Sequence, residues 1–174
     1  MRPPLVSVYA RYPEDMRLVR TMLARWKGKT IKALYIGPAY GEDYFSWLTV
    51  GFGVCGVYWS FLEIDEEAYN FLHSTDSSMD KLFWYLPPME GIHGDFTEEI
   101  KGEFDIIIAN HVWKNDIGEN KDSKDNINGL RNIIAAKPSI LIARDLQYKI
   151  QPFKACLQDY DMVKPFVFRR KEDG

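Results

Sequence analysis

The chain has 174 residues, a mass of 20.3 kDa and 46% apolar residues, so it can bury a substantial core. Its net charge of −3 argues against a dedicated nucleic-acid-binding protein, because such proteins neutralise phosphates with a basic surface. Cys55 and Cys156 are its two cysteines, and their spacing matches no metal or redox motif. No signal-peptide core or membrane-length apolar run occurs, so we expect a soluble, cytoplasmic, single-domain protein over residues 1–174.

The first half of the chain alternates between helix and strand patterns. Apolar residues recur at helical spacing after Pro13 and stop at Gly28, which predicts a helical lead-in within residues 1–30. Residues 74–88 contain two adjacent prolines and are expected to be irregular. The other elements expected here are a strand at 31–36, a helix at 43–52, a strand at 57–62 and a helix at 66–73.

The second half continues the alternation. The unbroken apolar run at 105–109 is typical of a central parallel strand that is buried on both faces. Around it we expect a strand at 90–93, a loop at 114–126, a helix at 127–136, a strand at 139–143, a helix at 150–158 and a strand region at 162–170. Together these elements predict an α/β core over residues 31–174. Its architecture is three-layer and doubly wound, with a mostly parallel sheet and a short C-terminal strand or hairpin.

Polar residues and glycines gather where the predicted strands end. In such a sheet, ligands bind beyond the carboxyl ends of the strands. The first strand ends at Gly37 and the chain passes Gly41 before the next helix, which gives backbone N–H groups and a close backbone approach. Glu63 ends the second strand, where an acid can hydrogen-bond ribose hydroxyls. This pattern indicates a nucleoside cofactor, although the glycines also suit a plain tight turn and Glu63 or Asp65 could cap the following helix.

The order of motifs resembles that of the class I S-adenosylmethionine-dependent methyltransferases, which have a Rossmann-like fold. The motifs that carry the resemblance lie at residues 35–41 (Tyr-Ile-Gly-Pro-Ala-Tyr-Gly), 63–65, 94–96, 104–112 and 137–142. Residues 41–46 and 162–170 are also similar to the chemotaxis receptor glutamate methyltransferases. The resemblance implies S-adenosylmethionine as cofactor, S-adenosylhomocysteine as product, and in-line methyl transfer to an unidentified acceptor.

Carried over to this sequence, the resemblance assigns the cofactor-binding positions Gly37, Ala39, Gly41, Glu42, Glu63, Ile64, Asp95, Phe96 and Asn110. It implies that Glu42 accepts a bond from the cofactor's amino group, that Glu63 holds the ribose and that Asp95 holds the adenine amine. Helix capping is an equally good reading of Asp95, because Thr97 and two glutamates follow it. His111 would lie near the methionine end and is the candidate catalytic base. The other two histidines lack partners at ligand spacing, so no metal is expected.

Three departures from the family pattern keep a second interpretation open. Tyr35 stands where many members carry an acid, and Ala39 and Ser139 replace glycines. The alternative is therefore a non-catalytic methyltransferase-like interaction module with weakened or lost cofactor binding. A nicotinamide-dependent oxidoreductase is disfavoured, because residues 37–41 are not G-x-G-x-x-G. A small molecule or a protein is expected as methyl acceptor in preference to nucleic acid, and no membrane partner is expected.

Overall fold

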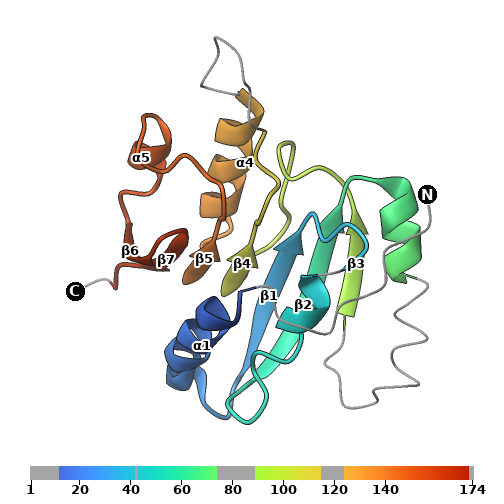
Figure 1. Ribbon diagram of the computed structural model, residues 1–174, viewed down its shortest axis with the longest axis vertical. Helices are drawn as coiled ribbons and strands as arrows, with labels where there is room; N and C mark the ends of the chain where they lie inside the picture. The colour runs from blue at the N-terminus through green and yellow to red at the C-terminus, as the bar shows by residue number, and fades with distance from the viewer. Residues whose placement is uncertain (1–11, 42, 74–88, 115–123, 173–174) are drawn as a thin grey trace. The chain divides into compact units, whose positions relative to one another are not determined.

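The computed structural model describes residues 12–41, 43–73, 89–114 and 124–172 (Figure 1). The chain divides into two compact units, Met1–Gly94 and Asp95–Gly174, and each is described by itself. The expectation of a single domain over residues 1–174 stays a prediction. The expected irregular segment 74–88 lies outside the described residues.

The first unit is built on three parallel strands in the order β3-β2-β1 (Figure 1). These are β1 (Thr30–Ile36), β2 (Gly56–Glu63) and β3 (Met89–His93). The last four residues of β1 and the last five of β2 are all buried, as expected for parallel strands that are covered on both faces. The strands predicted at 31–36, 57–62 and 90–93 are therefore confirmed to within one residue.

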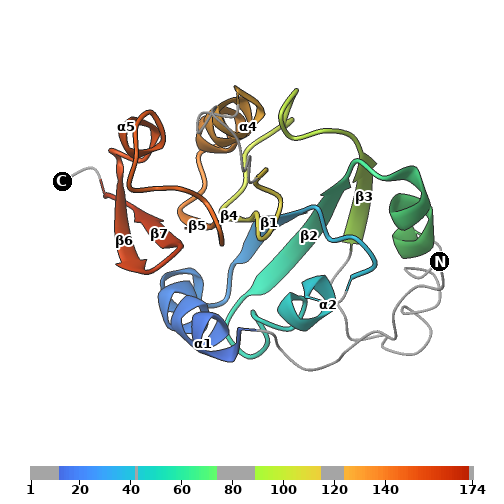
Figure 2. The same ribbon diagram turned by 45° about the horizontal axis from the view of Figure 1, so that its top comes forward.

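Helices accompany these strands in the first unit. Helix α1 (Pro13–Met22) begins at the predicted proline and continues as a 3-10 turn, η1 (Leu23–Trp26). Residues 66–73 are helical, as predicted, and lie beside β3 in both ribbon views (Figures 1 and 2). The Asp65 carboxylate accepts a hydrogen bond from the Ala68 N–H at 2.8 Å, so Asp65 caps this helix.

The helix predicted at 43–52 is wrong beyond Trp47, because α2 spans only Tyr44–Trp47. After Trp47 the chain forms turns that are closed by hydrogen bonds between residues three positions apart. Val50 N donates to Trp47 O, and Val54 N donates to Gly51 O. Gly53 then takes a φ of 76°. The helical hydrogen-bond pattern ends there, because these backbone groups are paired within turns and Gly53 has left the right-handed region.

In the described part of the second unit, four strands lie in the order β4-β5-β7-β6 (Figure 2). Strands β4 (Ile106–Ile108) and β5 (Ile140–Ile142) are parallel and completely buried. Strand β7 (Val167–Arg170) is antiparallel to β5 and to β6 (Tyr160–Lys164). The predicted C-terminal hairpin is therefore confirmed, and the chain turns between Lys164 and Val167.

Both helices of the second unit differ from their predicted bounds. Helix α4 (Lys124–Ala135) starts inside the segment 114–126, where we expected a loop. The buried Asn126 amide anchors this first turn, since it accepts a hydrogen bond from Lys114 N and donates one to Lys114 O, both at 2.9 Å. Helix α5 (Phe153–Cys156) is shorter than the predicted 150–158, because Leu157 leaves the helix and Tyr160 already begins β6.

Candidate functional site

The loop after β1 has an unusual backbone conformation. Gly37, Ala39 and Gly41 have φ values of 64°, 50° and 90°. Gly37 N donates to Leu62 O at 2.8 Å, and Gly41 N donates to Pro38 O at 2.8 Å, so the loop curls across the carboxyl end of β2. Ala39 adopts the left-handed region despite its Cβ, which costs about 1–2 kcal/mol, so the glycine usual at this position is not required for the turn.

Glu63 at the end of β2 joins two loops of the first unit. It is only 5% exposed. Its Oε2 accepts a hydrogen bond from Ala39 N at 2.8 Å, and its Oε1 accepts one from Asp65 N at 2.9 Å. Because each carboxylate oxygen can accept two hydrogen bonds, the group keeps acceptor capacity for a further donor. The structure thus brings the predicted residues Ala39 and Glu63 together.

Ile64, the next residue, is 62% exposed. Its carbonyl oxygen lies 3.0 Å from Nε2 of His93. The end of β2 therefore presents a carboxylate and an exposed apolar side chain in sequence, which is the combination expected for a ribose and a base.

A buried acid near this loop was missed by the sequence analysis. The Tyr35 hydroxyl donates a 2.5 Å hydrogen bond to Oδ2 of Asp43, and Trp47 Nε1 donates to the same oxygen at 3.3 Å. Asp43 is 8% exposed. Glu42, the predicted partner of the cofactor's amino group, lies outside the described residues. The one sequence signal for Asp43 was an acid just before the helix that follows the glycine loop.

Tyr40 lies in an acidic environment at the same loop. Its ring packs edge-on against Phe71, with 5.4 Å between the ring centroids. Desolvation, and then the nearby carboxylates of Glu67, Asp65 and Glu63, raise the pKa of the Tyr40 hydroxyl above its usual value. The hydroxyl therefore stays protonated at neutral pH and can donate a hydrogen bond.

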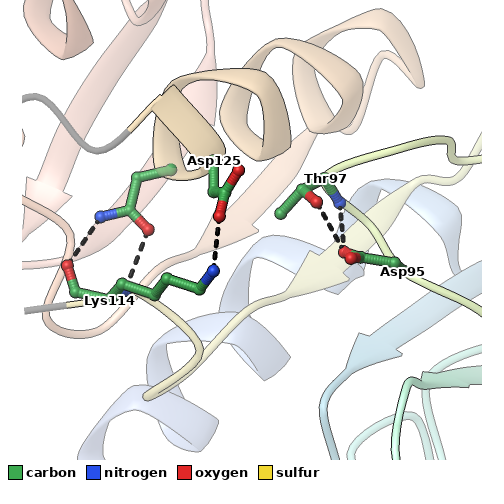
Figure 3. A network of polar contacts seen from close by, with 5 residues as sticks. Asp95, Thr97, Lys114 and Asp125 are labelled. Carbon is green, nitrogen blue, oxygen red and sulfur yellow. Dashed lines mark hydrogen bonds and ion pairs between the residues drawn. The ribbon is translucent and has the colours of Figure 1, made fainter.

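In the second unit, the Asp95 carboxylate stabilises its own turn. Its Oδ1 accepts hydrogen bonds from the N–H and the hydroxyl of Thr97, both at 2.8 Å (Figure 3). Glu98 N and Glu99 N both donate to Asp95 O. Residues 96–98 form a turn, so the carboxylate stabilises a turn instead of capping a helix. Its predicted bond to the adenine amine stays a prediction.

Phe96 packs against helix α4 of its own unit. Its ring meets Trp113 edge-to-face at 5.6 Å. A Cβ built on Gly129 would come within 2.2 Å of the same ring, so the absence of a side chain at 129 makes room for it. The ring is half-buried. The predicted role of Phe96 in flanking the base is not tested by these contacts.

Two neighbouring residues at the end of β4 make paired contacts. Asn110 is 4% exposed, and its Oδ1 accepts a hydrogen bond from Arg144 N at 3.1 Å. His111 Nδ1 pairs with Oδ2 of Asp145, and their side chains are 35% and 44% exposed. Because a carboxylate only accepts hydrogen bonds, Nδ1 carries the proton and Nε2 is the basic nitrogen of the neutral ring.

His111 and Asp145 also share a strained backbone. Their φ values are 58° and 72°, in the left-handed region that non-glycine residues seldom adopt. Strain of this kind costs about 1–3 kcal/mol per residue and is concentrated at functional sites. The pair of His111 and Asp145 was not foreseen from the sequence, which singled out His111 alone.

The comparisons with known proteins concern the fold. No family model matches the chain, and no curated protein matches it in sequence. Similar solved structures include a putative class I S-adenosylmethionine-dependent methyltransferase from Listeria monocytogenes, with 10% identity, a TM-score of 0.59, and coverage of 99% of this chain and 64% of that one. The chain has the fold of the class I methyltransferases. The predicted Rossmann-like α/β fold is therefore confirmed.

Two further solved structures are similar to most of the chain. MtNAS in complex with MTA and tNA matches at 14% identity and a TM-score of 0.54, covering 91% of this chain and 61% of that one. A putative sarcosine dimethylglycine methyltransferase from Galdieria sulphuraria matches at 15% identity and a TM-score of 0.52, covering 75% and 45%. The chain thus spans less than two thirds of the length of these proteins. The narrower resemblance to chemotaxis receptor methyltransferases stays a prediction.

Three further observations on the described residues concern metal ligands, membrane-spanning helices and disulfides. Among these residues, no three His, Cys, Asp or Glu side chains gather as metal ligands would. None of the helices within the described ranges is long and apolar enough to cross a bilayer. Neither Cys55 nor Cys156, which both lie in the described ranges, is part of a disulfide.

Proposed function

We propose that the protein transfers the methyl group of S-adenosylmethionine to an acceptor and releases S-adenosylhomocysteine. The observation that carries the proposal is the almost buried Glu63 carboxylate at the end of β2, bonded to the backbone of the loop after β1. An acid held there is suited to the hydroxyls of a ribose, and the fold is the one in which such cofactors bind. Within this proposal, Ile64 packs beside the adenine ring.

The remaining predicted positions complete the proposed cofactor site. The loop of Gly37, Ala39 and Gly41 offers a close backbone approach to the cofactor. Glu42, Asp95, Phe96 and Asn110 are proposed as further cofactor-binding residues on the strength of the family resemblance. The cofactor, when bound, supplies a methyl group that its positively charged sulfur has activated. The protein's own task is to align the reactants and exclude water.

His111 is the proposed proton acceptor for an acceptor molecule whose nucleophilic atom carries hydrogen. Its pairing with Asp145 fixes the ring tautomer, so that Nε2 is the nitrogen able to take a proton. We propose a small molecule or a protein as acceptor. A cytoplasmic location is also proposed.

One observation favours the alternative of a non-catalytic interaction module. Both oxygens of Glu63 already accept backbone hydrogen bonds, so the loop and the turn are stabilised by the protein alone. A chain that had lost its cofactor could keep this arrangement for structural reasons, and the departures at Tyr35 and Ala39 would then be tolerated.

Calorimetric titration of the purified protein with S-adenosylmethionine and S-adenosylhomocysteine decides between the two. The proposed enzyme binds both ligands with micromolar affinity, and transfer of a labelled methyl group to candidate acceptors then identifies the substrate. A folded sample that binds neither ligand at millimolar concentration would contradict the proposal and favour the interaction module.

A further inference from the structure

His93 ends strand β3 directly beside the acid of the candidate site. In the parallel register of β2 and β3, Glu63 and His93 are paired positions. His93 Nε2 lies 3.0 Å from the carbonyl oxygen of Ile64. A carbonyl oxygen can only accept a hydrogen bond, so Nε2 is protonated and donates to it.

Aromatic contacts hold the His93 ring in this orientation. Tyr69, on the helix 66–73, stacks on His93 with 5.3 Å between the ring centroids and 28° between the planes. The Tyr69 ring also stacks on His73 at 5.7 Å and 9°. These contacts restrict the rotation of His93 about its side-chain bonds, although the side chain itself is exposed.

The bond from His93 completes the set of contacts that fix the turn after β2. Gly94 N donates to Glu63 O at 3.0 Å, and Asp65 N donates to the Glu63 carboxylate at 2.9 Å. The Ile64 carbonyl, which lies between these groups in sequence, is held by the His93 side chain. The turn therefore holds Ile64 with its side chain 62% exposed while Glu63 stays buried.

We propose that His93 is a positioning residue for the nucleoside part of the cofactor. By holding the Ile64 carbonyl, it keeps the turn in the conformation that presents Ile64 to the base and Glu63 to the ribose. This inference rests on the proposed function. Preorganisation of this kind raises affinity because the ligand does not have to order the turn when it binds.

Two substitutions separate the hydrogen bond from the ring contacts. In His93→Gln the side-chain amide nitrogen can reach the place of Nε2, whereas in His93→Asn the amide lies at the place of Nδ1 and cannot reach Ile64 O. Both variants lose the stacking on Tyr69, so their difference isolates the bond. Affinities for S-adenosylhomocysteine and for 5′-methylthioadenosine, which lacks the amino-acid part, are measured by calorimetry, with the thermal midpoint of each ligand-free variant.

We expect His93→Asn to bind both ligands about threefold to tenfold more weakly than His93→Gln, which corresponds to one lost hydrogen bond. The two ligands should lose affinity by the same factor, since the turn faces only their shared nucleoside. A merely structural bond would lower the thermal midpoint of His93→Asn and leave both affinities unchanged. That result, or a loss confined to S-adenosylhomocysteine, would overturn the inference.

Nitrogen-15 NMR of the wild-type protein tests the same bond without any ligand. The chain has three histidines, and we expect His93 to carry its proton on Nε2. A proton on Nδ1 alone would overturn the inference while leaving the proposed function intact. Failure of the wild-type protein to bind either nucleoside would instead overturn the proposed function, and His93 would then have no cofactor to position.

Discussion

The hydroxyl of Tyr35, at the end of β1, donates a 2.5 Å hydrogen bond to the carboxylate of Asp43, which immediately precedes α2. Tyr35 stands where many class I methyltransferases carry an acid. Here a tyrosine and an acid eight residues later form one buried pair, so a carboxylate is present at the first glycine loop although position 35 lacks one.

Replacing Tyr35 by phenylalanine removes the hydroxyl that bonds the buried Asp43 carboxylate. We expect Tyr35→Phe to lower the free energy of unfolding by about 1–3 kcal/mol, because the buried Asp43 carboxylate loses the shorter of the two hydrogen bonds to its Oδ2, and the bond from Trp47 is longer, at 3.3 Å. Urea denaturation measures this loss. Tyr58→Phe is the control, since Tyr58 is 38% exposed and should change the free energy of unfolding by less than about 0.5 kcal/mol. Equal effects of the two substitutions would contradict the importance of the pair.

Replacing Glu63 by glutamine removes its charge and one acceptor oxygen, so that Ala39 N and Asp65 N cannot both keep their bonds. We expect Glu63→Gln to weaken S-adenosylhomocysteine binding tenfold or more, since charge-assisted bonds contribute about 1.5–3 kcal/mol. Calorimetry measures the affinity. Glu66→Gln, an exposed acid on the following helix, should bind as the wild type does. A Glu63→Gln variant with unchanged affinity and an intact fold would remove Glu63 from the site.

Gly41 needs both its backbone conformation and its lack of a side chain. Its φ is 90°, and a Cβ there would lie 2.4 Å from the Phe45 ring. Gly53 has a φ of 76° with nothing within 4 Å of an added Cβ, so it is a matched control for backbone strain alone. We expect Gly53→Ala to cost about 1–2 kcal/mol of stability and Gly41→Ala to cost about 1–3 kcal/mol more. Equal thermal shifts would show that the Phe45 ring moves aside without cost.

Because of the buried Tyr160 hydroxyl, we expect the free energy of unfolding to fall at alkaline pH. This hydroxyl donates to Pro138 O at 2.6 Å, and burial, opposed by Arg170, raises its pKa to about 12 from 10.0. Below pH 10 the phenol is protonated in both folded and unfolded chains. Between pH 10 and 12 only the unfolded chain ionises, so stability falls across this window by up to about 3 kcal/mol.

The alkaline prediction is checked by urea denaturation at pH 9 to 12 for the wild type and for Tyr160→Phe. The variant should be about 1 kcal/mol less stable at pH 7, because it lacks the bond to Pro138, but its stability should fall less steeply above pH 10. Parallel curves for the two proteins would show that Tyr160 does not cause the alkaline loss.

Asp145 should control which nitrogen of His111 carries the proton. In the wild type we expect the proton on Nδ1, because that atom faces the Asp145 carboxylate. Asp145→Asn introduces an amide that can donate as well as accept, so the two tautomers should coexist. Nitrogen-15 NMR distinguishes them, and the His93 signal serves as an internal reference that should not change. An unaltered His111 spectrum in Asp145→Asn would contradict the pairing.

The strands could be predicted from the sequence because each one coincides with a short run of apolar residues, and such runs are buried in the sheet. The apolar runs that form β1, β2, β4 and β5 are bounded by glycine, proline or polar residues, and each lies within one residue of its predicted position. Helix α2 could not be bounded in this way. Apolar residues continue past Trp47 at helical spacing, but the backbone N–H groups of Val50, Val54 and Cys55 are paired within turns instead of continuing the helix.

Candidate residues that lie at the end of a strand could be located from the sequence. Hydrogen bonds between residues far apart in the sequence could not. Glu63 was identified because an acid at a strand end is placed by the strand itself. The partner of His111 lies 34 positions away, and no periodicity connects the two residues. The same holds for the 29 positions between Ile64 and His93, whose bond arises from the pairing of two strands.

Helix α4 carries a glycine, Gly129, at the point where the Phe96 ring rests against it. A single methyl group at that point would lie within 2.2 Å of the ring, so either the ring or the helix would have to shift. The place of the Phe96 ring therefore depends on the absence of a side chain at residue 129 of helix α4. A conservative change at residue 129 would consequently have its structural effect at residue 96, where a comparison of sequences would show no difference.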